Sequence, residues 1–165
     1  MPEANHTKSS FAPIASNDTR ILILGSLPGD KSLELGQYYG HPRNRFWSLV
    51  ATLCNSPVPE TYAHKQQLLL QHRIGLWDVA HTAIRKGSLD SAIAAAVPNN
   101  LDHFLDNHRQ IRVVAFNGKK AEALFNTYFA RRGGIQYLSL PSTSPANAAA
   151  SPARLLEQWQ QIFRY

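Results

Sequence analysis

The stretch ILILGSLPGDKSLELGQYYGHPRNRFW, residues 21–47, decides the fold class of this chain. Its first four residues are all apolar and predict a short strand that is buried on both faces. That strand runs directly into GSLPG at 25–29, a tight turn between two glycines. Open parallel sheets build binding sites in such turns, at the carboxyl ends of their strands. The stretch therefore predicts an α/β protein with a site immediately after its first core strand.

A dense polar and aromatic segment, YYGHPRN at 38–44, follows that turn. This composition is unusual for a connecting loop and suits a site that grips a planar ring and a phosphate. Tyr39 can stack on a flat base, or it can pack in the core together with Tyr38. Asn44 can position a water molecule, or it can cap the helix that follows. His41 lacks partner ligands at metal spacing, which favours a structural hydrogen bond over a metal site.

Length and composition limit the class of protein. The chain has 165 residues, of which 44% are hydrophobic, enough for one domain with a substantial core. Its one cysteine, Cys54, excludes an internal disulfide and fits a reducing cytosol. We find neither a secretory signal nor a run of about 18 apolar residues, so no membrane span is predicted. We expect a flexible leader at 1–18, a single domain at 19–165 and a cytoplasmic location.

The charge balance points to a polyanionic partner. The net charge is +6, and the basic residues are scattered along the chain. This distribution predicts a basic face assembled by folding rather than a basic tail. Lys119 opens a predicted helix and can meet a phosphate there, although such a lysine is often simply solvated.

Strand–loop–helix units recur and predict a parallel sheet with helices on both faces. Further strands are expected at 112–116 and 136–140, and an extended segment at 75–77 delivers Asp78 to a loop. Helices are expected at 43–54, 61–72, 91–97, 100–107 and 119–130, and in an amphipathic segment near the C-terminus. The loops GSLPG, FNGKK and LPSTSPAN follow strands, so they should converge on one edge of the sheet. GSLPG is not GxGxxG and NGKK is not a Walker loop, so a dinucleotide or nucleoside triphosphate site is not indicated.

Asp78 and the segment LPSTSPAN at 140–147 supply the remaining candidate groups. The Asp78 carboxylate can accept from a base N–H, act as a general base or cap a turn. It has no obvious acidic partner, which argues against a two-carboxylate glycosidase. The hydroxyls and backbone N–H groups of 140–147 can hold phosphate, with Pro-Ala as a small wedge into a base stack. Ser144 and Asn147 are also good helix-capping residues.

Together, four of these segments resemble motifs of the uracil-DNA glycosylase superfamily, in the family's order. GSLPG resembles the first motif, YGHPRNRFW a segment of the mismatch-specific uracil/thymine glycosylases, and LPSTSPAN the loop that enters the minor groove. GLWDVAHTAIRKGS matches the place of the base-reading strand end, with Asp78 where classical uracil enzymes have Asn. The first motif usually carries a water-activating Asn or Asp, but that position here is Leu27. YYGHPRN and SPAN resemble the hypoxanthine-DNA glycosylase (DNA-deoxyinosine glycosylase) branch, in which the catalytic Asn corresponds to Asn44.

This resemblance implies a three-layer α/β/α sandwich on a short central parallel sheet. It implies a monofunctional enzyme that hydrolyses the N-glycosidic bond of a flipped deaminated base, hypoxanthine or uracil, in damaged DNA. No metal or cofactor is required, and we expect a monomer associated with the nucleoid. The implied site residues are Asn44 for the water; Gly25, Ser26, Leu27, Tyr39 and Asp78 for the base; and Ser142, Ser144, Pro145, Ala146, Asn147 and Lys119 for DNA.

Two other functions stay open from the sequence. The first is a non-catalytic nucleic-acid-binding module with the same fold, suggested by Leu27 and opposed by Asn44. The second is an enzyme that acts on free nucleosides, opposed by the basic charge balance and the Ser/Pro-rich loop.

Overall fold

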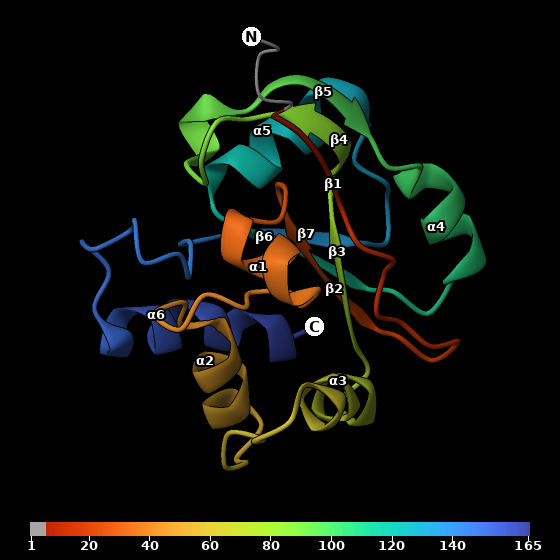
Figure 1. Cartoon of the computed structure of the whole chain (residues 1–165). Coiled ribbons are helices and arrows are strands. Elements are labelled where there is room, and N and C mark those ends of the chain that lie inside the picture. The colour runs from red at the N-terminus through yellow and green to blue at the C-terminus, as the bar shows by residue number, and fades with distance from the viewer. Residues whose placement is uncertain (1–5) are drawn as a thin grey trace, which may run out of the picture.

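The computed structural model describes residues 6–165 and contains a four-stranded parallel sheet at its centre (Figure 1). The strand order is β3-β2-β6-β7, with bounds Ile74–Asp78, Ile21–Gly25, Val113–Asn117 and Gln136–Leu140. Every residue of β2 is buried, as the apolar run predicts for a central strand. The parallel sheet predicted from the strand–loop–helix pattern is therefore confirmed.

Side chains of β2 point alternately into two separate cores. Ile21 and Ile23 pack in one cluster, and Leu22 and Leu24 pack in the other. The first cluster is covered by α2 (Phe46–Leu53), α3 (Tyr62–Gln71) and α6 (Pro152–Trp159). The second is covered by α4 (Leu101–Asn107) and α5 (Lys119–Tyr128). Helices on both faces of the sheet make the α/β/α arrangement that was predicted.

A small antiparallel sheet with the order β1-β4-β5 completes the second face, and the sequence analysis missed it. Its strands are Thr7–Ser9, Ala80–Ile84 and Ala94–Pro98. The helix predicted at 91–97 is wrong, because this alanine-rich segment pairs with β4 after the short turn η1 (Asp90–Ala92). Alanine has the highest helix propensity, but such propensities are small, and pairing with a neighbouring strand overrides them here.

Part of the predicted flexible leader is ordered. Within residues 1–18, β1 pairs with β4 and Ile14 bridges Leu76 of β3. The backbone N–H of Ile14 donates to the Leu76 carbonyl at 2.9 Å, and the N–H of Leu76 donates to the Ile14 carbonyl at 2.8 Å. The prediction of flexibility is therefore wrong from Thr7 onward, and residues 1–5 lie outside the described part of the chain.

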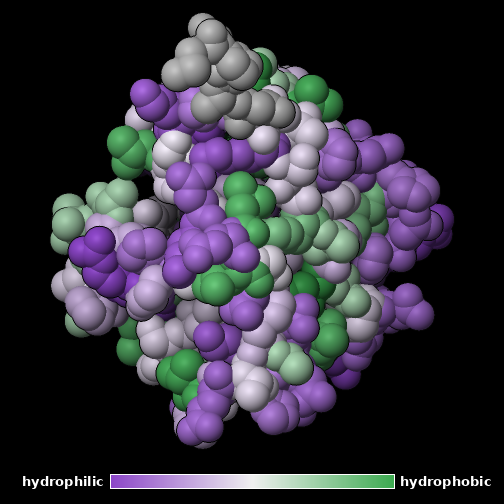
Figure 2. Space-filling view, viewed as in Figure 1, coloured by the Kyte–Doolittle hydropathy of each residue, from purple (hydrophilic) through white to green (hydrophobic). Residues whose placement is uncertain are grey.

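The remaining elements agree with the predicted positions within a few residues. α2 begins at Phe46 rather than at 43, and the short helix α1 (Asp30–Leu35) replaces a stretch predicted only as polar. A short helical turn, η2 (Gln160–Phe163), continues α6. On the face shown in Figure 2, apolar residues are scattered among hydrophilic ones. Among the described residues, no helix is long and apolar enough to cross a membrane.

Candidate active site

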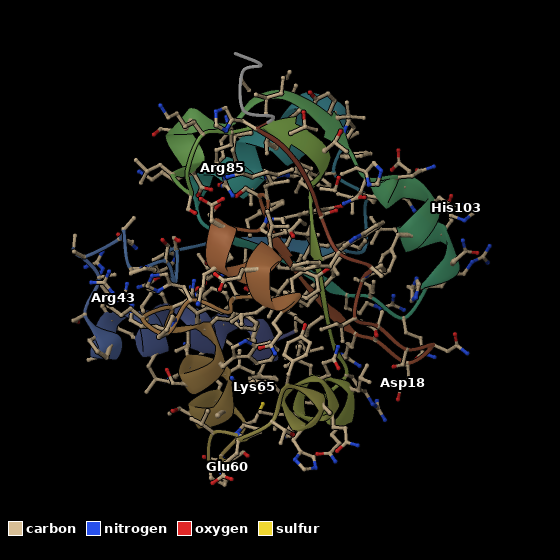
Figure 3. All side chains as sticks on the ribbon, in the orientation of Figure 1. Asp18, Arg43, Glu60, Lys65, Arg85 and His103 are labelled. Atoms are coloured by element: carbon tan, nitrogen blue, oxygen red, sulfur yellow. The ribbon has the colours of Figure 1, made fainter. Side chains whose placement is uncertain are left out.

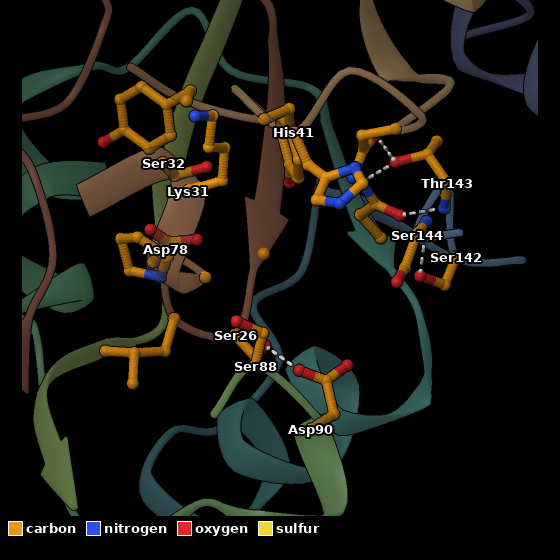
Figure 4. Close-up of a pocket in the computed structure, with 18 of the residues that line it drawn as sticks. Ser26, Lys31, Ser32, His41, Asp78, Ser88, Asp90, Ser142, Thr143 and Ser144 are labelled. Carbon is orange, nitrogen blue, oxygen red and sulfur yellow. Dashed lines mark hydrogen bonds between the residues drawn. The ribbon is translucent and has the colours of Figure 1, made fainter. Parts of the chain in front are cut away.

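A cavity lies at the carboxyl edge of the parallel sheet, where the predicted loops converge (Figure 4). The strand register sets its floor, because Gly25 of β2 pairs with Asp78 of β3, and β6 ends beside them at Asn117. Residues after β7 form the opposite side of the cavity from Asp78 (Figure 4). All the residues predicted to bind the base or the water line this cavity: Gly25, Ser26, Leu27, Tyr39, Asn44 and Asp78.

The predicted DNA-binding residues divide between two places. Ser142, Ser144 and Pro145 line the cavity itself. Lys119 and Asn147 instead line a neighbouring groove, which also includes Ser142. Ala146 lines neither, and its backbone N–H donates to the Ser144 hydroxyl at 3.2 Å. Neither capping alternative for this loop applies, because the side chain that caps α6 belongs to Ser151.

Gly25 permits two side chains to approach the backbone closely. A Cβ atom at this position would lie 2.5 Å from Oδ1 of Asp78 and 2.8 Å from the hydroxyl of Tyr39. Both distances are far below normal van der Waals contact, so no other residue type fits without displacing these two groups. Glycine is therefore required at position 25 for steric reasons as well as for the geometry of the turn.

The Asp78 carboxylate is buried without a hydrogen-bond partner. Asp78 is 4% exposed, and its Oδ2 is fully buried without any partner in residues 6–165. Burial raises the pKa of this carboxyl to about 7, the nearby Arg85 guanidinium opposes the shift, and Asp90 adds to it. A buried carboxylate that folding leaves unpaired is a candidate for ligand recognition.

The two adjacent tyrosines have different roles. Tyr38 belongs to the core, and its hydroxyl donates to the Ala12 carbonyl at 2.8 Å. Tyr39 lines the cavity with a positive φ of 52°, and its ring packs on Phe46 with ring centroids 4.3 Å apart. The Tyr39 hydroxyl is buried and makes no hydrogen bond of normal geometry, although the Asn117 amide lies nearby. Burial raises the pKa of Tyr39, so this residue stays a neutral phenol.

Asn44 takes part in a hydrogen-bond chain that crosses the cavity wall. Its Oδ1 accepts from the backbone N–H of Phe46 and from the Thr143 hydroxyl, both at 2.9 Å. Thr143 is fully buried and in turn meets the Asn117 amide. His41 accepts from the backbone N–H of Arg43 at 3.1 Å, which is the structural hydrogen bond that was expected.

Arg45, which was not predicted from the sequence as a site residue, holds the loop at 142–150 in place. Its guanidinium donates to the Asn147 carbonyl at 2.8 Å, to the Ser144 carbonyl at 3.4 Å and to the Ala150 carbonyl. A planar group with several N–H donors suits this task, which a lysine ammonium cannot reproduce. The sequence shows only that an Arg directly follows Asn44. The carbonyls that Arg45 binds lie about a hundred residues further along the chain, so its role was not visible.

Arg85 and Asp90 were likewise not predicted from the sequence as site residues. They hold the GSLPG turn on the side of the cavity opposite Arg45. Asp90 accepts from the Ser26 hydroxyl at 2.6 Å and lies 3.8 Å from the Arg85 guanidinium. The Arg85 side chain is 1% exposed and donates to the Pro28 carbonyl. Figure 3 shows Arg85 between the GSLPG region and the β4–β5 connection. The turn that forms the cavity floor is thus held in place by the buried Arg85 and by Asp90, whose side chain is 42% exposed.

The side chain of Leu27 does not supply chemistry to this site. It is 6% exposed and packs in the second core cluster, between the sheet and the small antiparallel sheet. This side chain is apolar and cannot activate water, so a water-activating group has to come from elsewhere. Asn44 and Asn117 are the two asparagines among the residues that line the cavity.

Comparison with known proteins agrees with this geometry. Residues 13–163 match the model of the uracil DNA glycosylase superfamily, and the chain belongs to that superfamily. It is therefore a DNA glycosylase, a hydrolase of N-glycosidic bonds. Among its relatives, a hypoxanthine DNA glycosylase of Methanosarcina acetivorans is 38% identical over 96% of this chain and 99% of that protein.

Two further relatives support the same assignment. A hypoxanthine DNA glycosylase of Methanosarcina barkeri is 35% identical over 95% of this chain and 98% of that protein. A solution NMR structure from Methanosarcina acetivorans, described as that of a uracil DNA glycosylase, superimposes with a TM-score of 0.78 at 34% identity. The superposition covers 94% of this chain and 98% of that one.

Replacing Gly25 by alanine should displace Asp78 and Tyr39, because the new methyl group overlaps both. We expect a folded protein whose single-turnover excision rate falls by about 100-fold, since small misplacements of reacting groups are this costly. Gly133→Ala is the matched control, because a Cβ there meets no atom within 4 Å. A Gly25→Ala variant as fast as Gly133→Ala would show that this close approach is not needed.

Replacing Asp78 by asparagine should stabilise the protein at neutral and higher pH. The folded-state pKa lies above the ordinary value of 3.8, so the wild type loses stability as pH rises from about 4 through 7. Each pKa unit is worth about 1.4 kcal/mol, so the advantage of the variant grows toward about 4 kcal/mol over this range. Urea unfolding of Asp78→Asn and of the exposed control Asp18→Asn across this pH range measures it. A difference that stays constant with pH would contradict the burial of a charge.

Proposed function

We propose that this DNA glycosylase excises hypoxanthine from DNA, with uracil as a second substrate that presents the same hydrogen-bonding edge. The observation that carries the proposal is the unpaired Asp78 carboxylate at the floor of the cavity. The names of its relatives support hypoxanthine as the first choice. The base enters the cavity after the nucleotide is flipped out of the stack, which is easiest at a mismatch.

Asp78 reads the edge of the base. In its ionised form the carboxylate accepts from N1–H of hypoxanthine or N3–H of uracil. Adenine has an unprotonated ring nitrogen at this position. Two hydrogen-bond acceptors, this nitrogen and the Asp78 carboxylate, would then face each other, which disfavours adenine. Backbone N–H groups of the turn at 25–27 donate to the neighbouring carbonyl of the base. The same groups stabilise the negative charge that the base acquires as it departs.

The Tyr39 ring stacks on the flat face of the base. Its ring already packs on Phe46, so the base extends an existing aromatic stack. Stacking on an aromatic side chain contributes roughly 1–3 kcal/mol per base in single-strand binders. It holds any planar base, so stacking supplies affinity while Asp78 supplies selectivity.

Hydrolysis follows as the bond from C1′ to the base nitrogen breaks. Its electron pair leaves with the base, and an oxocarbenium-like sugar remains. The oxygen of a water held by Asn44 forms the new bond to C1′ and releases a proton, and the departing base gains a proton in the overall reaction. No strand cleavage is part of this sequence, so the product is an abasic site in intact DNA.

The DNA backbone runs from the cavity along the neighbouring groove. Lys119, Lys120 and Arg154 line this groove together with Ser142. The hydroxyls of Ser142 and Ser144 accept hydrogen bonds from the backbone of their own loop, so their protons remain available to phosphate. Arg43 is exposed beside this loop (Figure 3) and extends the basic surface. Pro145 to Asn147 fill the gap left by the flipped base.

We further propose that the protein works as a monomer at the nucleoid in the cytoplasm. One cavity contains all the residues assigned to the reaction, so a second copy has no group to add. Damaged DNA as the substrate supports this location.

An excision assay tests the function directly. Oligonucleotides containing deoxyinosine, deoxyuridine or deoxyxanthosine, single-stranded or paired, are incubated with the protein and then treated with alkali. We expect strand breaks only after alkali, most with deoxyinosine, and almost none with Asn44→Ala, which should still bind lesion DNA. Strongest cleavage of deoxyuridine would overturn the preferred base. Binding of DNA without cleavage of any lesion would instead identify a non-catalytic module.

Salt dependence of binding tests the path of the DNA. Lys119→Ala removes one charge from the groove, so the slope of log K against log salt should fall by about 1. Lys65→Ala on α3 removes one charge elsewhere and is the control, since its ammonium lies over the Trp47 ring. Equal slopes for the two variants would rule out a phosphate contact at Lys119.

A further inference from the structure

We propose that Asn44 acts as a hydrogen-bond donor to the water, and that Thr143 and Asn117 are positioning residues that hold its amide in this orientation. The inference rests on the proposed function and deepens it. The end of the Asn44 amide that faces the cavity decides what this residue can do to the water.

Two backbone N–H groups determine the polarity of the whole hydrogen-bond chain. The backbone N–H of Thr143 donates to Oδ1 of Asn117 at 3.0 Å, so the other end of that amide is its NH₂ group. This NH₂ group donates to the Thr143 hydroxyl at 3.1 Å. The hydroxyl therefore directs its own proton to Oδ1 of Asn44 at 2.9 Å. The backbone N–H of Phe46 donates to the same oxygen.

Both lone pairs of the Asn44 oxygen are thus occupied. An amide oxygen offers two lone pairs, and here one is taken by Phe46 and the other by Thr143. Turning the amide over would set its NH₂ group against the backbone N–H of Phe46, lose that bond and leave the Thr143 hydroxyl proton without its acceptor. Because Thr143 is fully buried and Asn117 is 6% exposed, water cannot replace the lost partners.

The NH₂ group of Asn44 is the end that remains for the substrate. It forms no hydrogen bond within residues 6–165, and it is not among the fully buried unpaired atoms there. Since Asn44 lines the cavity, this nitrogen reaches its open space. Asn44 can therefore donate to the oxygen of a water, leaving a second lone pair of that water for C1′.

A donor of this kind orients the water but does not take its proton. This role suits a reaction in which the sugar is already oxocarbenium-like. A strong electrophile reacts with neutral water, so the position of the water matters more than removal of its proton. The alternative role, in which the Asn44 oxygen accepts from the water, requires a lone pair that the wall of the cavity already uses.

Asn44→Asp separates the two roles. A carboxylate has nearly the same shape and keeps both accepted hydrogen bonds, but it has no N–H for the water. We expect the single-turnover rate on deoxyinosine DNA at neutral pH to fall by about 100-fold or more. The ratio of the variant's rate to the wild-type rate should rise as pH falls. Protonation of the new carboxylate has to place the proton on the oxygen that faces the cavity, where it restores a donor to the water. His41, Asp78 and the other titratable groups of the cavity are common to both proteins, so the ratio isolates residue 44. An Asn44→Asp variant as fast as wild type at neutral pH would overturn the proposal.

Substitutions at Thr143 test the positioning role. Thr143→Val removes the hydroxyl at nearly constant volume, and we expect a rate about 10-fold or more below wild type with lesion binding retained. Thr143→Ser restores the hydroxyl and should restore most of the rate. Thr19→Val is the control, because Thr19 is equally buried and its hydroxyl accepts from Ser16 away from the cavity. Equal rates for Thr143→Val and Thr143→Ser would exclude the positioning role. A wild type inactive on every lesion would refute the proposed function instead, which is a separate outcome.

Discussion

The close approach of Asp78 and Tyr39 over Gly25 is the contact on which the rest of the site depends. It exists because β2 and β3 pair in one register, with Gly25 opposite Asp78, and because residue 25 has no side chain. A shift by one residue would turn Asp78 away from the cavity and bury Trp77 in its place, since successive strand residues point to opposite faces. Both apolar cores resist such a shift, so packing far from the cavity protects its chemistry.

The cavity combines rigid walls with unpaired polar groups. Arg85, Asp90 and Ser26 hold one side, and Arg45 holds the other through three backbone carbonyls. The buried Asp78 carboxylate is left without a partner between these walls. An unpaired buried charge costs stability, and the pKa of about 7 records that cost. The fold tolerates this charge because Ser26, Asp90 and Arg45 in the flanking walls are hydrogen-bonded, and such a local cost is usual at a binding site.

Local signals in the sequence were enough for the framework of the fold and much of the candidate site. The buried strands appear as short apolar runs, and turn residues follow each of them, so the carboxyl edge could be located. The groups that complete the walls gave no such signal, because Arg45 and Arg85 find partners 102 and 57 residues away. Asn117 lay in a loop expected at the right edge, but its connection to Thr143 exists only after folding. The strand at 94–98 was missed because alanine carries little information about pairing.

Thr143 lies between two serines assigned to the DNA backbone, while its own hydroxyl points inward to Asn44. In the proposed mechanism, one short loop serves the nucleic acid on one side and the reacting water on the other. This limits how such an enzyme can be engineered or can diversify. In the proposed mechanism, a loop transplanted from a relative to change DNA preference would slow the chemistry unless it also brings a hydroxyl to position 143, so the two properties would have to be exchanged together.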